Sequence, residues 1–526
     1  MSRRLLVIPA VLILAGLAVF LAGPSGEPQA ARMVPVHLAL PSTRVCSSPS
    51  AIAGPARAPK GSIRVPAGSN ANVNFGRAHK IFWFAPGVHT LGKGEYHAVL
   101  VGSGSTYIGA PGAVLNGQFA NESAFGGEAT HVTVEDLTIK NFVPPGDQGA
   151  VNHDAAPHWV LRRDVIEDNA PGAGVMMGTD DAVVGSCITK NGQYGINGYV
   201  ESYTSEANSL THGPSNLVLE GNEISYNGTC DWEKISPNPT PKKDRPGNCA
   251  GAGEYDGCGC SGGAKFWRVD GALIRDNFVY HNYYVGLWVD TDNTGFNILD
   301  NDIAQNWAEG LMYEISYNAR IQGNEFVNNA WGEGPYNTGF PTGAIYVSES
   351  GGSPRVPGRD SGLFRISKNA FYNNWSGVIL WENSNRFCGS PDFPGVCTLV
   401  APRTANLVSC TVAKITGSKS LNALCRWKTQ NVKVENNVFD SNERAIPGCH
   451  GVSNSCGENG VFSEYGSVAP FRGDKVPEAI TFHQKNLFAD NRYSTGWMFM
   501  VYQGGDVVSF STWRHQYHQD PGSKVA

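Results

Sequence analysis

The chain has 526 residues with a formal net charge of −6, and only 16% of its residues are charged. A hydrophobic content of 41% with 12 tryptophans excludes a disordered chain, and the low charge argues against a coiled coil or a helical solenoid. The slightly acidic balance leaves no basic footprint for nucleic acid, so we expect no nucleic-acid partner.

The N-terminal segment is typical of an exported protein. Two arginines near the start precede an apolar run over residues 5–23, which is longer than most signal-peptide cores and just long enough to span a bilayer. The sequence predicts a signal peptide or membrane anchor over residues 1–30. A linker over residues 31–60 and one domain over residues 61–526 follow. We expect the mature protein outside the cell, either secreted or anchored at the outer face of the membrane.

Twelve cysteines fit an oxidising compartment. Ten of them fall in local pairs, and two are left over: Cys230/Cys249, Cys258/Cys260, Cys388/Cys397, Cys410/Cys425 and Cys449/Cys456, with Cys46 and Cys187 remaining. The spacings match no structural zinc motif. We therefore expect disulfides that pin loops, although the pairing itself does not follow from the sequence.

A six-residue motif, Asn-x-(apolar or Thr)-x-x-Asn, recurs along the chain. It occupies residues 222–227, 277–282, 301–306, 324–329, 369–374, 437–442 and 486–491, and weaker versions start at Asp136, Asp164 and Ser186. The tightest spacings are 22, 23 and 24 residues, and short alternating strands lie between the motifs, without helix-length periodicity. This pattern predicts an all-β solenoid, a parallel β-helix of about ten coils, in which the asparagines form structural ladders.

These motifs, with the strand sequences Gly-Leu-Trp-Val-Asp and Tyr-Glu-Ile-Ser-Tyr-Asn, resemble bacterial exported proteins of the pectin-lyase-like, right-handed parallel β-helix superfamily. The resemblance covers about residues 60–520 and concerns the fold. That superfamily includes polysaccharide lyases, glycoside hydrolases, epimerases and non-enzymatic surface proteins, so the resemblance does not choose an activity.

Aligning the coils on the glycine after each motif places two acids on one face. Residues 286–290 then lie over residues 310–314, with Leu287 and Tyr313 directed inward and Asp290 and Glu314 directed outward. Adjacent parallel strands lie ~4.8 Å apart, so the two carboxylates are predicted neighbours that need a proton, a cation or a basic side chain between them.

The neighbouring coils supply the other candidate site residues. Lys265 and Trp267 align on the same face one coil earlier, whereas the register of Glu349 and Glu382 stays open, because a one-residue slip turns a side chain inward. Tryptophans provide flat platforms suited to sugar rings. The candidate substrate-binding residues are Trp267, Trp288, Trp381, Tyr313, Glu349, Glu382 and Arg386.

Insertions between the repeats suggest a cleft. They fall near residues 228–262, 330–362 and 385–430, whereas the coils of Asp290 and Glu314 carry almost none. Insertions on one face of a solenoid often mark its binding side. We expect a walled groove with the two carboxylates on its floor.

Three functions fit these residues, each with a polysaccharide as the partner of a monomeric protein. The first is a glycoside hydrolase that uses Asp290 and Glu314 and requires no cofactor. The second is a lyase or epimerase on a uronic-acid polymer, with Lys265 as the base and a cation such as Ca²⁺ held by Asp290, Asp292 and Glu314. The third is a non-catalytic cell-wall or carbohydrate-binding protein in which the same acids hold structural calcium.

Overall fold

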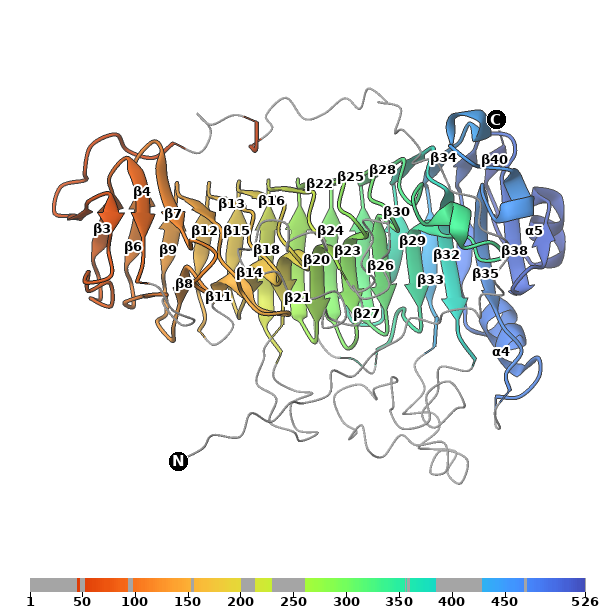
Figure 1. Cartoon of the computed structure of the whole chain (residues 1–526). Helices are drawn as coiled ribbons and strands as arrows, with labels where there is room; N and C mark the ends of the chain where they lie inside the picture. The colour runs from red at the N-terminus through yellow and green to blue at the C-terminus, as the bar shows by residue number, and fades with distance from the viewer. Residues whose placement is uncertain are drawn as a thin grey trace.

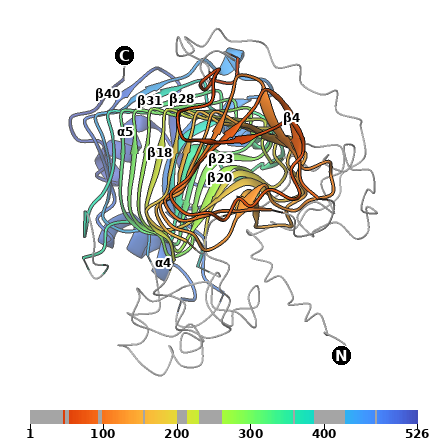
Figure 2. The same cartoon turned by 90° about the vertical axis from the view of Figure 1, so that its left-hand side faces the viewer.

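The computed structural model describes residues 45–47, 53–92, 98–152, 156–199, 213–228, 261–354, 356, 360–384, 428–467 and 471–525. Within these residues the chain winds into one long parallel β-helix, with three sheets running along its axis (Figure 1). The view toward the end of the solenoid shows the coils stacked on one another (Figure 2). The predicted all-β solenoid is confirmed.

Each sheet takes one strand from each successive coil. Sheet A contains β1 (Ile63–Val65), β3 (Ile81–Phe84), β6 (Thr106–Gly109), β9 (Thr133–Glu135), β12 (Val160–Arg162), β15 (Ala182–Val184), β18 (Ser215–Glu220), β21 (Asp270–Arg275), β24 (Thr294–Leu299), β27 (Tyr317–Gln322), β30 (Phe364–Ser367), β33 (Val432–Glu435) and β36 (Leu487–Ala489). Sheet B contains β2 (Gly68–Ser69), β4 (Gly87–Thr90), β7 (Ala113–Asn116), β10 (Thr138–Lys140), β13 (Val165–Glu167), β16 (Cys187–Thr189), β19 (Glu223–Ser225), β22 (Phe278–Tyr280), β25 (Asp302–Ala304), β28 (Glu325–Val327), β31 (Ala370–Tyr372), β34 (Val438–Asp440), β37 (Arg492–Tyr493) and β40 (Lys524–Val525). Sheet C contains β5 (Val99–Leu100), β8 (Phe125–Gly126), β11 (Gly149–Asn152), β14 (Ala173–Met177), β17 (Tyr194–Gly198), β20 (Gly262–Trp267), β23 (Val285–Asp290), β26 (Leu311–Glu314), β29 (Gly343–Ser348), β32 (Ser376–Glu382), β35 (Glu458–Ser463), β38 (Met498–Gln503) and the antiparallel β39 (Val507–Val508).

The solenoid is longer than the ten coils predicted. Sheets A and C have 13 strands each and sheet B has 14 among the described residues. The additional coils lie mostly at the N-terminal end, where the coils of β1 to β8 carry no copy of the Asn motif, so the repeat is not visible in their sequence.

Helical segments are short. Within the described residues they are η5 (Gly334–Tyr336), η7 (Glu443–Ala445), η8 (Gly451–Asn454), α4 (Lys475–Glu478), the π-helical η9 (Ala479–His483) and α5 (Phe510–Gln516). Helix α5 covers the C-terminal end of the core, where the Trp513 ring stacks on Phe499 at 4.8 Å between centroids. None of the described helices is both long and apolar enough to cross a membrane.

One apolar core fills the interior of the coils. It runs continuously from Val65 to Trp513 and takes every second side chain of the central strands. On β23, for example, Leu287 and Val289 belong to this core, whereas Trp288 belongs to a separate apolar cluster. That alternation is expected of a strand with two different faces.

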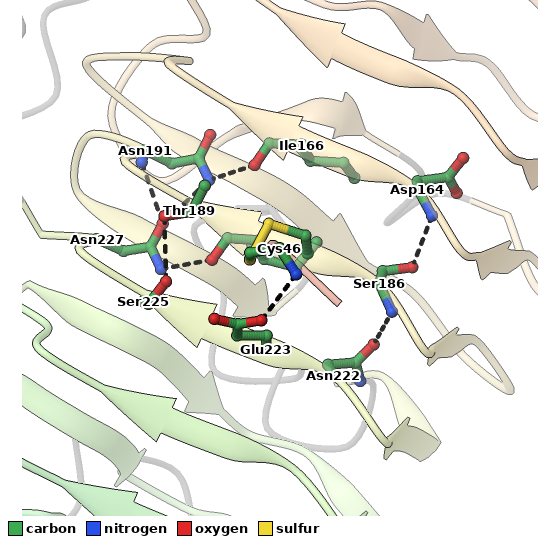
Figure 3. Close-up of a disulfide and its surroundings, with 12 residues drawn as sticks. Cys46, Asp164, Ile166, Ser186, Thr189, Asn191, Asn222, Glu223, Ser225 and Asn227 are labelled. Atoms are coloured by element: carbon green, nitrogen blue, oxygen red, sulfur yellow. Dashed lines mark hydrogen bonds between the residues drawn. A yellow bond between two sulfur atoms is a disulfide. The ribbon is translucent and has the colours of Figure 1, made fainter. Parts of the chain in front are cut away.

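Two asparagine ladders hold the coils in register. In the first, the Asn301 side chain accepts from the backbone N–H of Asn277 at 3.0 Å and donates to the Ile274 carbonyl at 2.9 Å. The second joins equivalent residues such as Asn191 and Asn227 at 3.0 Å (Figure 3). Because these amides satisfy buried backbone groups, the predicted structural role of the motif is confirmed.

The first ladder continues past its asparagines into the weaker motif copies. The backbone N–H of Asp164 donates to Ser186 Oγ at 3.1 Å, and the N–H of Ser186 donates to Asn222 Oδ1 at 2.9 Å (Figure 3). A short oxygen-bearing side chain at this position is therefore sufficient to continue the ladder.

Two disulfides lie in the described residues. Cys449 and Cys456 form the predicted local pair, and the two leftover cysteines, Cys46 and Cys187, join each other across 141 residues. The backbone N–H of Cys46 also donates to Glu223 at 2.7 Å, on the outer face of sheet B (Figure 3). The other four predicted pairs lie outside the described residues, as do the predicted signal segment and Arg386.

We expect the long-range disulfide to stabilise the fold more than the local one. A cross-link restricts the unfolded chain more when it closes a longer loop, so Cys46→Ala with Cys187→Ala should lower the free energy of unfolding by about 3 kcal/mol. Urea unfolding measures this loss, and the matched control is Cys449→Ala with Cys456→Ala, whose bond closes a loop of sequence separation 7. An equal or larger loss in the control variant would contradict the expectation.

Candidate functional site

Strands β20, β23 and β26 lie in the predicted register. Trp288 is the partner of Lys265 on one side and of Met312 on the other, and Asp290 is the partner of Trp267. Trp288 and Met312 belong to the apolar cluster outside the interior core. The alternation then places Asp290 and Glu314 on this same outer face, one coil apart.

Lys265 neutralises the first of the two acids. Its ammonium group lies 3.2 Å from Asp290 Oδ2 and 4.1 Å from the centroid of the Trp288 ring. An ion pair and a cation–π contact both favour the charged ammonium. A basic side chain therefore offsets the repulsion between the two neighbouring carboxylates, which is one of the three arrangements that the sequence predicted.

Glu314 is held by hydrogen bonds from two neighbouring coils. The Trp288 indole N–H donates to Glu314 Oε2 at 3.0 Å, and the Ser348 hydroxyl donates to Glu314 Oε1 at 3.4 Å. Ser348 is the register partner of Glu314 in β29. This carboxylate is thus fixed in orientation on the outer face.

The sequence predicted that the two acids lie on the open floor of a groove, but in the structure they are covered. Asp290 is 2% exposed and Glu314 is 3% exposed. In the described part of the insertions, Phe340 folds back onto this face and its ring meets Trp381 at 5.1 Å and Phe462 at 5.5 Å. This insertion therefore covers part of the outer face of sheet C and does not only form the side of a groove.

Tyr313 is not a surface residue. Its side chain is fully buried in the interior core, with its ring edge-on to Phe364 at 4.9 Å. Its assignment to substrate binding is therefore wrong, because alternation along β26 points it away from the face that carries Glu314.

Glu349 and Glu382 also lie off the line of the two acids. Each follows the position in register with Glu314, because Ser348 pairs with Trp381. Glu349 Oε1 accepts from the Asn383 backbone N–H at 2.6 Å, and Glu382 Oε2 accepts from the Thr429 N–H at 3.1 Å. Both carboxylates are buried and support backbone, so the expectation that they face a substrate is not met.

The three candidate tryptophans do share the outer face, with different surroundings. Trp267 is partly exposed, and the Arg268 guanidinium lies over its ring at 4.3 Å. Trp288 and Trp381 are 4% and 9% exposed and belong to the outer apolar cluster. The most accessible end of the row is therefore at Trp267 and Lys265.

The proposed cation ligands are not assembled. Within the described residues, no group of three or more His, Cys, Asp or Glu side chains could hold a metal ion. Asp292 lies beyond the end of β23 with a left-handed backbone (φ 58°) and is 3% exposed. Asp290, Asp292 and Glu314 are therefore not gathered into one group of ligands in the described part of the chain.

The sequence did not predict two further acids beside this site. Glu309 precedes β26 and is 4% exposed. Glu333 lies directly before η5, in the segment of residues 330–342 that follows β28 and is called the η5 loop. Burial, followed by the charge of Glu333, raises the pKa of Glu309 well above its usual range. Burial raises the pKa of Glu333 to about 7. The sequence offered one signal, the glycines on either side of Glu333, which allow close backbone packing.

Comparison with known proteins agrees with this architecture. Residues 116–356 match the family model of the right handed beta helix region. The molecule is a right-handed parallel β-helix. Among curated proteins no sequence relative matches the chain.

Solved structures with a similar course of the chain have very different sequences. The catalytic unit of a thermostable GH87 alpha-1,3-glucanase from Streptomyces thermodiastaticus is 11% identical, with a TM-score of 0.49. The matched region covers 90% of this β-helix chain and 70% of the glucanase chain. A PL6 family polysaccharide lyase from Pseudopedobacter saltans is 10% identical with a TM-score of 0.43, covering 89% and 93%. The A-module of an Azotobacter vinelandii mannuronan C-5 epimerase is 14% identical with a TM-score of 0.36, covering 60% and 86%. At this level of likeness, the activity of this β-helix must be argued from its own residues.

Proposed function

We propose that this β-helix protein is a carbohydrate-cleaving enzyme, a glycoside hydrolase, whose site is the outer face of sheet C around Asp290 and Glu314. The supporting observation is the pair of register-matched carboxylates, with Asp290 ion-paired to Lys265 and Glu314 held by the Trp288 indole. Glycoside hydrolysis passes through an oxocarbenium-like transition state, and fixed carboxylates in a site of low exposure stabilise that positive charge.

The tryptophans on the same face support a carbohydrate as the substrate. Trp288 lies directly between the coils of Lys265 and Glu314, and Trp267 is the partner of Asp290. Aromatic rings with polar edges suit the apolar faces of sugar rings. Substrate would enter at the partly exposed Trp267 and Lys265 end.

Hydrolysis is favoured over elimination by the surroundings of Lys265. A lyase would need this amine neutral in order to abstract a proton α to a carboxylate. Its 3.2 Å contact with Asp290 and its position over Trp288 stabilise the protonated amine instead. Lys265 is therefore better suited to orienting Asp290 than to acting as a base.

A polysaccharide panel with two readouts tests the proposal. We expect the full-length protein to release shorter sugars from a neutral polymer, with product masses that account for one added water and no new ultraviolet absorbance. Neutral glucans and uronic-acid polymers form the two arms. Products that absorb in the ultraviolet and lack the added water would establish a lyase, and binding without cleavage on every polymer would establish a carbohydrate-binding protein.

A further inference from the structure

The acids Glu309 and Glu333 lie on two chain segments that are hydrogen-bonded to each other. The Ala330 N–H donates to the Ala308 carbonyl at 2.9 Å, and the Glu333 N–H donates to the Trp307 carbonyl at 3.0 Å. The η5 loop therefore runs along the residues that lead into β26, and its acid is brought next to Glu309.

Close packing fixes the loop at this point. A Cβ atom added at Gly332 would lie 2.3 Å from the Trp307 ring, and one added at Gly334 would lie 2.2 Å from the Trp375 ring. Only glycine fits these two positions, so the segment Gly-Glu-Gly seats Glu333 between two tryptophans. The backbone of Glu333 is thus held beside the segment that carries Glu309.

Each acid carries a buried oxygen without a hydrogen-bond partner. These are Oε2 of Glu309 and Oε2 of Glu333. Two carboxylates are only acceptors and repel each other, but a protonated carboxyl group is also a donor, so a single proton satisfies both oxygens. Two neighbouring carboxyl oxygens without other partners are therefore best satisfied by one shared proton.

We propose that Glu309 and Glu333 form a carboxyl pair that holds one proton and supplies the acid for the site of Glu314. This inference rests on the proposed hydrolase function for the identity of the reaction, but the proton-holding pair itself does not depend on it. The charged groups of the neighbouring site are Glu314, Asp290 and Lys265, and the charge of Glu314 also acts on Glu309.

Glu309 and Glu314 stand five residues apart on the segment that leads into β26 and forms it. The charge of Glu314 acts on Glu309. A protonated carboxyl group beside a carboxylate supplies the acid and the base that an inverting glycosidase requires.

The reaction step then balances with water as the co-reactant. The proton leaves the pair for the glycosidic oxygen, and the bond from that oxygen to the anomeric carbon breaks. The oxygen of a water molecule bonds to the anomeric carbon and gives its proton to Glu314. That proton returns to the pair through solvent, so the net reaction consumes one water.

Carboxyl titration by carbon-13 NMR tests the pair without any substrate. With the full-length protein labelled at glutamate side chains, we expect one carboxyl proton of the pair to be lost near pH 7 and the second at higher pH. In Glu333→Gln the first transition should disappear and the second should move to lower pH, because the charge of Glu333 no longer raises the pKa of Glu309. The matched control is Glu458→Gln, because burial raises the pKa of this fully buried glutamate to about 8. That variant should leave both transitions of the pair in place. A wild-type protein with no carboxyl transition near pH 7, or an upper transition that stays at the same pH in Glu333→Gln, would overturn the pair.

Cleavage kinetics test its role as the acid. On a polysaccharide that the wild type cleaves, Glu333→Gln should be at least about 100-fold slower, and an aryl glycoside of the same sugar, whose leaving group needs no proton, should restore most of the rate. An unchanged rate on the polysaccharide would refute the acid role while the hydrolase stands. Absence of wild-type cleavage would refute the hydrolase, and the NMR titration would still decide whether the pair exists.

Discussion

Replacing Glu314 by glutamine should reduce polysaccharide cleavage by about 10³-fold and leave the fold intact. The substitution removes the negative charge that serves as the base and stabilises the developing cation, effects that together contribute several powers of ten. The glutamine carbonyl can still accept the Trp288 indole N–H, which bonds Glu314 Oε2 at 3.0 Å in the wild type. Initial rates at saturating substrate, with the melting temperature as the check on folding, measure the effect.

Glu349→Gln is the matched control for that variant. Glu349 is also a fully buried glutamate at the end of a sheet C strand, but it lies one position beyond the register partner of Glu314 and accepts from the Asn383 backbone. Its amide can replace that contact, so activity should stay within a few-fold of wild type. Equal losses in the two variants would show that the activity responds to packing and not to the carboxylate of Glu314.

The register of the candidate site was predictable because strand periodicity and the Asn motif act together. Once the coils are aligned on their motifs, alternation decides which side chains share a face, and Lys265, Trp288 and Asp290 lie as that rule requires. The same rule already directed Tyr313 inward. Glu349 lies one residue beyond the register partner of Glu314. A shift of one residue turns a side chain to the other face of the strand, so its position could not be predicted from alternation alone.

The burial of the site and its second acid pair could not be predicted from periodicity. Both depend on the path of residues 330–342, which follows no repeat and is set by contacts between coils. The Trp307 and Trp375 rings meet this loop at Gly332 and Gly334, and Phe340 returns to the face at Trp381. Such contacts depend on how the loop folds back between coils, and the periodicity of a single sequence gives no sign of them.

The asparagine ladder carries the largest stability prediction. Asn301→Ala should lower the free energy of unfolding by about 4 kcal/mol, because it removes the partners of several buried groups at once. The Asn301 side chain accepts from both the backbone N–H and the side-chain amide of Asn277, and it donates to Ile274 and Asn324. Each buried donor or acceptor left without a partner costs about 1–3 kcal/mol.

A graded series separates the ladder bonds from the loss of volume. Asn301→Ser should lose roughly half as much, because the hydroxyl of Ser186 already continues the same ladder by accepting from Asp164 and donating to Val184. Asn74→Ala, at an exposed position whose side chain accepts from the Gly76 N–H, should lose less than about 1 kcal/mol. Denaturant unfolding followed by circular dichroism measures all three. If serine and alanine at position 301 destabilise equally, the ladder does not act through hydrogen bonds that a hydroxyl can replace, and packing of the amide between the coils must account for the loss.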